Sequence, residues 1–105
     1  NGKLTPFKEF NDQLPYIFGK PKINEFLKFK EIIDDSKFSY NQIENLYFFP
    51  SKRWDIEFKN NKILKLPEKS VDISLDYLFE FLNNKEFSNI KIIDARIKNQ
   101  IILNE

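Results

Sequence analysis

The chain has 105 residues, which fits one domain. Its net charge is +1, with 17 basic and 16 acidic residues interspersed, and this balance argues against a dedicated nucleic-acid binder. The sequence contains neither His nor Cys, which removes thiol nucleophiles, Ser-His-Asp triads, zinc fingers and disulfides. We therefore expect no metal, no cofactor and no enzymatic activity that depends on these groups.

The start of the chain, Asn1-Gly2-Lys3-Leu4, is typical of the middle of a turn. No apolar run approaches the roughly 20 residues of a membrane span, and no signal peptide is visible. We expect residues 1–105 to be one domain taken from a longer protein.

The first third of the chain predicts an extended segment followed by a helix. Residues 14–19 form a short extended stretch that ends at a glycine. Pro21 can start a helix, because its missing N–H falls among donors that a first turn leaves free. Apolar residues then recur at mostly helical spacings as far as Asp34-Asp35, namely Ile23, Phe26, Leu27, Phe29, Ile32 and Ile33.

From Tyr40 onward the pattern favours strands. Residues 42–49 are rich in β-formers and end at Pro50. Trp54, Ile56 and Phe58 alternate with charged residues, which is typical of a half-buried strand with its apolar side in the core. Asn60-Asn61 follows as a hairpin turn, and the partner strand, residues 63–66, ends at Pro67.

The last third predicts a second helix and two strands. Ser70 or Asp72 can cap the helix, which ends at Asn83-Asn84, and residues 90–97 and 100–103 form strands joined across Lys98-Asn99. The fold class is therefore α+β: a mainly antiparallel sheet with two helices on one face and an open C-terminal edge strand. The buried face of the second helix is assigned to Val71, Leu75, Leu78, Phe79 and Leu82, broadened by Tyr77 and Phe81.

The carboxylates match no recognisable acid–base signature. Asp55 and Glu57 share one strand face, which we interpret as solvated surface. The only glycines are Gly2 and Gly19, so no phosphate-binding glycine loop exists. The remaining candidates are Asp34-Asp35, Glu44, Glu68 and Asp94.

Aromatic residues beside lysines could stack on a single-stranded nucleic acid, but they fall on the faces predicted to be buried. We therefore expect no nucleic-acid partner. Asp94 and Arg96, two residues apart on one strand face, predict a local ion pair near the end of the sheet. Two interpretations stay open: a surface salt bridge of little energetic value, or an arginine positioned at the rim of a binding surface.

Four short sequence motifs follow one another along the chain. They are Asn1-Gly2, then Leu14-Pro15-Tyr16-Ile17-Phe18-Gly19, then Arg53-Trp54-Asp55-Ile56-Glu57-Phe58 with Asn60-Asn61 and Ile63-Leu64-Lys65-Leu66-Pro67, then Ile92-Ile93-Asp94-Ala95-Arg96. Together they resemble the C-terminal β domain of the bacterial FtsQ/DivIB cell-division family. Departures are Asn61, where a glycine is common, Ala95 in place of a leucine, Ile97 in place of an aromatic residue, and a glycine-free turn at residues 98–100.

The resemblance implies a non-catalytic divisome scaffold on the periplasmic face of the inner membrane, at the septum. The full-length protein would carry one N-terminal membrane helix and a POTRA domain. Its β domain would bind the FtsB/FtsL-type (DivIC/FtsL) coiled-coil pair, with no small-molecule substrate, and link early and late division proteins. We expect strand addition to residues 100–104, at a site made of Arg53, Arg96, Ile97, Lys98, Asn99, Gln100, Ile101, Ile102, Leu103 and Asn104.

Three alternatives remain at this point. A neighbouring region of the longer protein could cover the expected edge strand. A different envelope-assembly or lipid-binding module would show a large internal cavity lined by Phe. A small hydrolase or transferase would show two carboxyl groups converging in a deep pocket.

Overall fold

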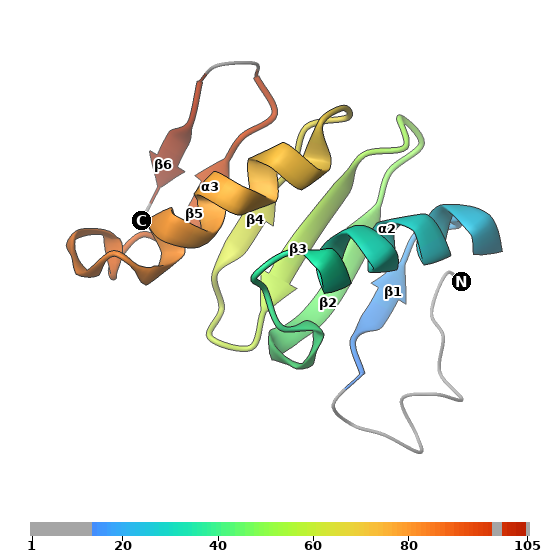
Figure 1. Cartoon of the computed structure of the whole chain (residues 1–105), viewed down its shortest axis with the longest axis horizontal. Coiled ribbons are helices and arrows are strands. Elements are labelled where there is room, and N and C mark those ends of the chain that lie inside the picture. The colour runs from blue at the N-terminus through green and yellow to red at the C-terminus, as the bar shows by residue number, and fades with distance from the viewer. Residues whose placement is uncertain (1–13, 98–99, 105) are drawn as a thin grey trace.

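The computed structural model describes residues 14–97 and 100–104, and its helices and strands follow one another in a simple order (Figure 1). The elements are β1 (Tyr16–Phe18), α2 (Ile23–Asp35), a 3-10 turn (Tyr40–Gln42), β2 (Ile43–Phe48), β3 (Trp54–Phe58), β4 (Ile63–Lys65), α3 (Val71–Asn83), a second 3-10 turn (Lys85–Phe87), β5 (Ile92–Asp94) and β6 (Ile102–Asn104).

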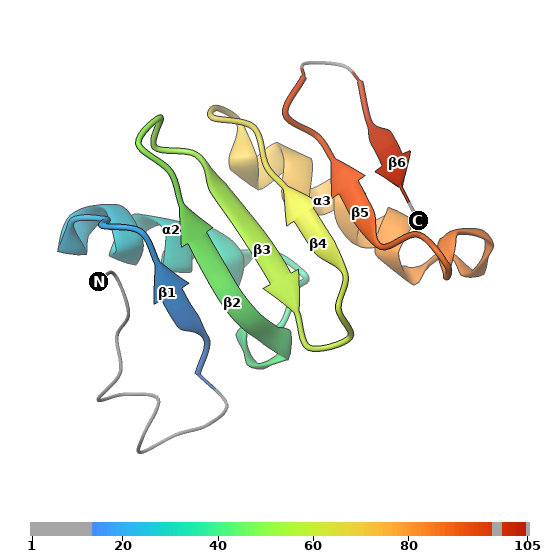
Figure 2. The ribbon, with the colours of Figure 1, turned by 180° about the vertical axis from the view of Figure 1, so that it is seen from behind.

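The strands form one six-stranded sheet whose spatial order, β1 to β6, is also their order in the chain. The pairs β1–β2 and β4–β5 are parallel, because a helix lies between their strands, and the other three pairs are antiparallel. Both helices cover the same face of the sheet, and the opposite face is open in the view from behind (Figure 2). The predicted α+β class, with a mainly antiparallel sheet, is confirmed.

Some predicted element boundaries were wrong. The stretch at residues 16–18 is a true edge strand, β1. Three residues are too few to show the alternation that identifies a strand. The strand predicted over residues 90–97 is regular only at Ile92–Asp94. Beyond it, the Ala95 N–H still donates to the Lys65 carbonyl, but the chain then turns toward the last strand, which begins at Ile102 rather than at Gln100.

The core lies between the sheet and the two helices. One row of residues in register crosses the sheet from β1 to β5, and every side chain in it is at most 2% exposed. Phe29 and Ile33 of α2, and Leu75 and Leu78 of α3, close over this row. The row consists of Ile17, Leu46, Ile56, Leu64 and Ile93.

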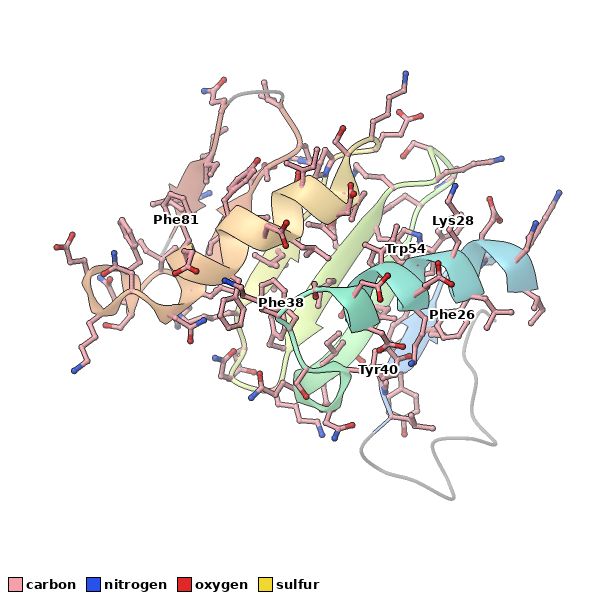
Figure 3. The ribbon with its side chains drawn as sticks, in the orientation of Figure 1. Phe26, Lys28, Phe38, Tyr40, Trp54 and Phe81 are labelled. Carbon is pink, nitrogen blue, oxygen red and sulfur yellow. The ribbon has the colours of Figure 1, made fainter. Side chains whose placement is uncertain are left out.

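Trp54 joins α2 to the sheet, as the alternation along its strand predicted. Its side chain is 6% exposed and stacks on Phe29, with 4.4 Å between ring centroids and 3° between ring planes (Figure 3). Phe38 lies between α2 and α3, and packs against Phe58 and edge-on against Phe79. Stacked rings of this kind add stability beyond the area they bury.

Large side chains of both helices are exposed, and one of them, Tyr77, was assigned to the buried face of α3. Ile23 and Leu27 of α2 are 69% and 57% exposed, and Tyr77 of α3 is 42% exposed. Each helix touches the sheet along a narrow stripe, and these residues lie beside that stripe. Ser70 occupies the predicted N-cap of α3, but its backbone is left-handed and its side chain makes no capping hydrogen bond, so the predicted cap was wrong.

Two turns need unusual backbone angles. Asn61 has φ +72°, as expected for the hairpin between β3 and β4. Gly19 has φ +102°, and a Cβ at this position would collide with the backbone carbonyl oxygen of Phe48. Gly19 therefore lets the turn between β1 and α2 lie against the end of β2. Neither helix in the described part of the chain is long and apolar enough to cross a membrane.

Candidate partner-binding surface

The C-terminal edge of the sheet is strand β6. Within the described residues β6 pairs only with β5, in the register Ile92–Asn104, Ile93–Leu103 and Asp94–Ile102. Leu103 packs against the core, whereas Ile102 is 38% exposed. One side of β6 thus carries backbone N–H and C=O groups that no strand of the described chain pairs.

Arg96 is held in place at the end of β5. It donates from Nε to Asp94 Oδ1 at 2.9 Å and from Nη2 to Asp94 Oδ2 at 2.6 Å, and its backbone N–H donates to Oδ1 at 3.1 Å. The predicted ion pair is therefore confirmed, and it is bidentate. The Asp94 side chain is 11% exposed and that of Arg96 is 45% exposed, so the guanidinium is fixed but still reaches solvent.

Arg53 is more internal than Arg96. Its side chain is 16% exposed, donates from Nη1 to Asp55 Oδ1 and to the Leu66 carbonyl at 3.2 Å, and lies over the Phe49 ring. These contacts use Arg53 to tie β3 to the end of β4. Of the two arginines assigned to the binding site, Arg96 is the more available.

Asp55 was expected on a solvated face, and that interpretation was wrong, because the residue is only 7% exposed. Arg53 pairs with it, and Tyr47 and Lys65 stand beside it on the neighbouring strands. Burial is the largest influence on its pKa and raises it, although the hydrogen bond and charge of Arg53 act in the opposite direction. Its neighbour Glu57 is half-buried and accepts hydrogen bonds rather than facing open water.

The open face of the sheet therefore carries a charge row, made of Arg53, Asp55, Lys65, Asp94 and Arg96. Asp55, Lys65 and Asp94 are aligned in register across β3, β4 and β5. The next position in this register is Ile102 of β6. The row thus brings both predicted arginines onto one face and leads from the middle of the sheet to its C-terminal edge.

A groove of about 520 Å³ lies on the helix side of the same edge, between α3 and the chain that follows β5. Three exposed apolar side chains line it: Ile73, Tyr77 and Ile97, of which Ile97 is 54% exposed. The sequence analysis assigned only Ile97 to the site and placed Tyr77 in the core. Ile73 was not assigned to any face, although it lies one turn before Tyr77 on the same side of α3.

The structure locates eight of the ten residues assigned to the partner site. Gln100 and Asn104 are exposed, and Ile101 packs against the core. Lys98 and Asn99 lie outside the described residues. The eight described positions are Arg53, Arg96, Ile97, Gln100, Ile101, Ile102, Leu103 and Asn104.

The carboxylate-dependent alternative stays open, because Asp35, Glu68, Asp72 and Asp76 line a hollow of about 700 Å³ between α2 and the start of α3. Asp55 and Asp94, the buried carboxylates, are each engaged by an arginine, and Lys65 stands between them in register. The hollow lined by Phe38, Phe58 and Phe79 has about 90 Å³ and is not a large lipid cavity. In the part of the chain described here, no group of three or more acidic residues could hold a metal ion.

No family model matches the chain. The chain is 44% identical over 52 residues to a Rickettsia conorii protein named "Cell division protein FtsQ". This similarity supports an FtsQ-like family. The matched segment makes up 47% of this chain and 19% of the relative, so the FtsQ-like region spans about a fifth of that protein's length. The name of that relative describes it as a cell-division protein.

Proposed function

We propose that this FtsQ-like chain is the extracytoplasmic β domain of a division scaffold. In this proposal it does no chemistry, and it captures FtsB/FtsL-type (DivIC/FtsL) coiled-coil partners by adding one of their strands to β6. The full-length protein would be anchored by one N-terminal helix in the inner membrane, with this domain on the periplasmic side at the septum. It would link early and late division proteins there.

The observation that carries this proposal is the unpaired outer side of β6. Edge strands usually avoid pairing with other chains by means of proline, charge or a bulge. The segment Ile101-Ile102-Leu103 has no proline and no charged residue. A partner strand that pairs with this edge would satisfy its backbone groups, and backbone pairing is the usual source of affinity in strand addition.

Selectivity in this proposal comes from Arg96. Asp94 fixes its guanidinium through two side-chain hydrogen bonds, and 45% of the Arg96 side chain is exposed. Ile102 of the edge strand stands opposite Asp94 in register. An acidic side chain that flanks the added strand would meet a preorganised cation, which costs less ordering entropy than a free one.

Proline substitutions test strand addition directly. Along an edge strand the N–H groups of consecutive residues point alternately inward and outward. Proline at one of Ile101 and Ile102 should therefore abolish binding of a partner-derived peptide, while proline at the other should mainly damage the fold. The backbone of Ile93 pairs with β4, so the backbone groups of Asp94 face β6 and its partner Ile102, which makes Ile102 the more damaging position for the fold and Ile101 the outward one. Binding is measured by peptide titration, with circular dichroism to confirm folding.

Two further variants complete this titration. Ile101→Ala keeps the backbone N–H that points outward and should bind far better than Ile101→Pro. Arg96→Glu should weaken binding by at least about tenfold, because it reverses the charge beside the added strand. Strand addition at β6 is ruled out if both proline variants stay folded and bind the peptide as well as wild type does.

A further inference from the structure

The first two turns of α2 present apolar side chains to solvent. Ile23 and Leu27 are 69% and 57% exposed, and their i, i+4 spacing places them on one side of the helix. The buried side of the same helix is formed by Phe29 and Ile33. Nothing in the described fold covers Ile23 or Leu27.

Four lysines lie at the same end of the molecule as this apolar pair. Lys20 and Lys22 precede the helix, Lys28 follows Leu27, and all three are exposed. Lys52 belongs to the turn between β2 and β3, and its Nζ lies 3.6 Å from the Glu25 carboxylate, which places this turn beside the first turn of α2. The two views of the ribbon agree that both segments lie at the same end of the molecule (Figures 1 and 2).

Within the first two turns of α2 the acidic residue is Glu25. Its side chain is 23% exposed and accepts a hydrogen bond from the Lys22 backbone N–H. The other acids of α2 are Glu31, an exposed residue one turn beyond Leu27 on the same side of the helix, and Asp34 and Asp35 at its end, where Asp34 pairs with Lys30 at 2.6 Å. The positive end of the helix dipole adds to the lysine charge at the N-terminus.

From this arrangement we propose that the α2 tip, defined as Lys20, Lys22, Ile23, Leu27, Lys28 and Lys52, binds the surface of an anionic phospholipid membrane. Ile23 and Leu27 enter the boundary between headgroups and acyl chains, and the lysines lie over the lipid phosphates. This activity goes beyond the proposed capture of partners at β6, which occupies the opposite edge of the sheet.

The side-chain chemistry favours lipid over a protein partner. Every cation of the α2 tip is a lysine, whose long aliphatic stem can lie along an apolar surface while its ammonium stays in water. Protein interfaces favour arginine and are depleted in lysine, and both arginines of this chain lie in the charge row on the open face instead. Figure 3 shows Lys28 projecting outward from α2.

Vesicle co-sedimentation tests the proposal. The 105-residue chain is mixed with vesicles of equal parts phosphatidylglycerol and phosphatidylcholine, or of phosphatidylcholine alone. We expect binding to the anionic vesicles only, weakened by raised ionic strength. The variant Lys22→Glu/Lys52→Glu should lower the partition coefficient at least about tenfold, because each lysine near an anionic surface contributes appreciably. The variant Ile23→Ser/Leu27→Ser should also lower it about tenfold through lost apolar insertion.

The matched control lies at the start of the other helix. Lys69→Glu/Ile73→Ser changes an exposed lysine and an isoleucine that is 61% exposed, and it should leave vesicle binding unchanged. Circular dichroism shows that each variant is folded. The proposal is overturned if anionic vesicles do not bind the chain, or if the control loses as much binding as the α2 variants. Binding that survives Ile23→Ser/Leu27→Ser would overturn lipid insertion and assign the tip to an acidic partner held by charge alone.

Discussion

Asp55 and Asp94 lie in the same charge row, yet their environments move their pKa values in opposite directions. Two hydrogen bonds from the Arg96 side chain are the main reason why the pKa of Asp94 is lowered. Burial raises the pKa of Asp55 despite the presence of Arg53. The ionised form of Asp94 is therefore favoured by folding, whereas the ionised form of Asp55 is disfavoured.

This difference predicts how acid acts on stability. Because the folded-state pKa of Asp94 is lowered, its contribution is fully present above the unfolded-state pKa and is lost as pH falls through the folded-state pKa. We expect Asp94→Asn to be less stable than wild type by a constant amount above about pH 5, and the difference to shrink below about pH 4. Urea unfolding across this pH range measures it.

The control for this prediction removes the partner cation. In an Arg96→Gln background, Asp94→Asn should have a much smaller effect at neutral pH, because the hydrogen bonds that lower the pKa are gone. Acid affects stability through Asp55 in the opposite direction, since protonation relieves the cost of burying its charge. This effect is the same with and without Asp94→Asn, so it cancels when the two proteins are compared. A stability gap between wild type and Asp94→Asn that does not change with pH would contradict the assignment.

At the scale of elements, the contact between α2 and β3 depends on Trp54. Its ring lies between Phe29 of the helix and Phe48 of the neighbouring strand. Trp54→Ala should lower the free energy of unfolding by roughly 3–5 kcal/mol, as large truncations in cores do. Chemical denaturation followed by circular dichroism at helical wavelengths measures the change.

Tyr77→Ala is the matched control for Trp54→Ala. It removes another large aromatic side chain, but one that is 42% exposed on α3, so we expect a much smaller loss of stability. Equal losses in the two variants would show that Trp54 does not join the helix to the sheet.

The elements that the sequence specified best are those with a clear local period. Trp54, Ile56 and Phe58 alternate strictly, and the following Asn60-Asn61 turn has the backbone that this pair favours, so the β3–β4 hairpin was predictable nearly to the residue. The three residues of β1 carry no period, and its parallel pairing with β2 depends on the packing of α2. The sequence alone could therefore show neither that β1 is a strand nor that it pairs with β2.

Burial at the candidate site was harder to predict. In the alternating pattern of its strand, Asp55 occupies a position that should face solvent. The neighbouring side chains of Arg53, Tyr47 and Lys65 bury it. The ion pair between Asp94 and Arg96 was predictable, because both residues belong to one strand face, two residues apart. Tyr77 was assigned to the core because helical spacing shows which side of a helix is apolar. It does not show how much of that side the sheet covers.

At the scale of the whole molecule, stability should not depend on a metal or cofactor. The chain has no His and no Cys, and the described residues contain no acidic cluster that could hold a metal. We expect a chelator to leave the melting temperature unchanged, and elemental analysis to find no stoichiometric transition metal. A shift of several degrees on chelation would contradict this prediction.

The order of strands in the sheet equals their order in the chain, so every strand pairs only with its nearest strands in sequence. The three antiparallel pairs join strands that are close in sequence, whereas the two parallel pairs join residues 29 positions apart, such as Tyr16 with Asn45 and Ile63 with Ile92. The sheet can be assembled in the direction in which a ribosome delivers it, with β1 first and β6 last. Strand β6 is the last of the six to be synthesised, and like β1 at the other edge it shares its backbone bonds with a single neighbour, so hydrogen exchange should detect opening first at these two edges.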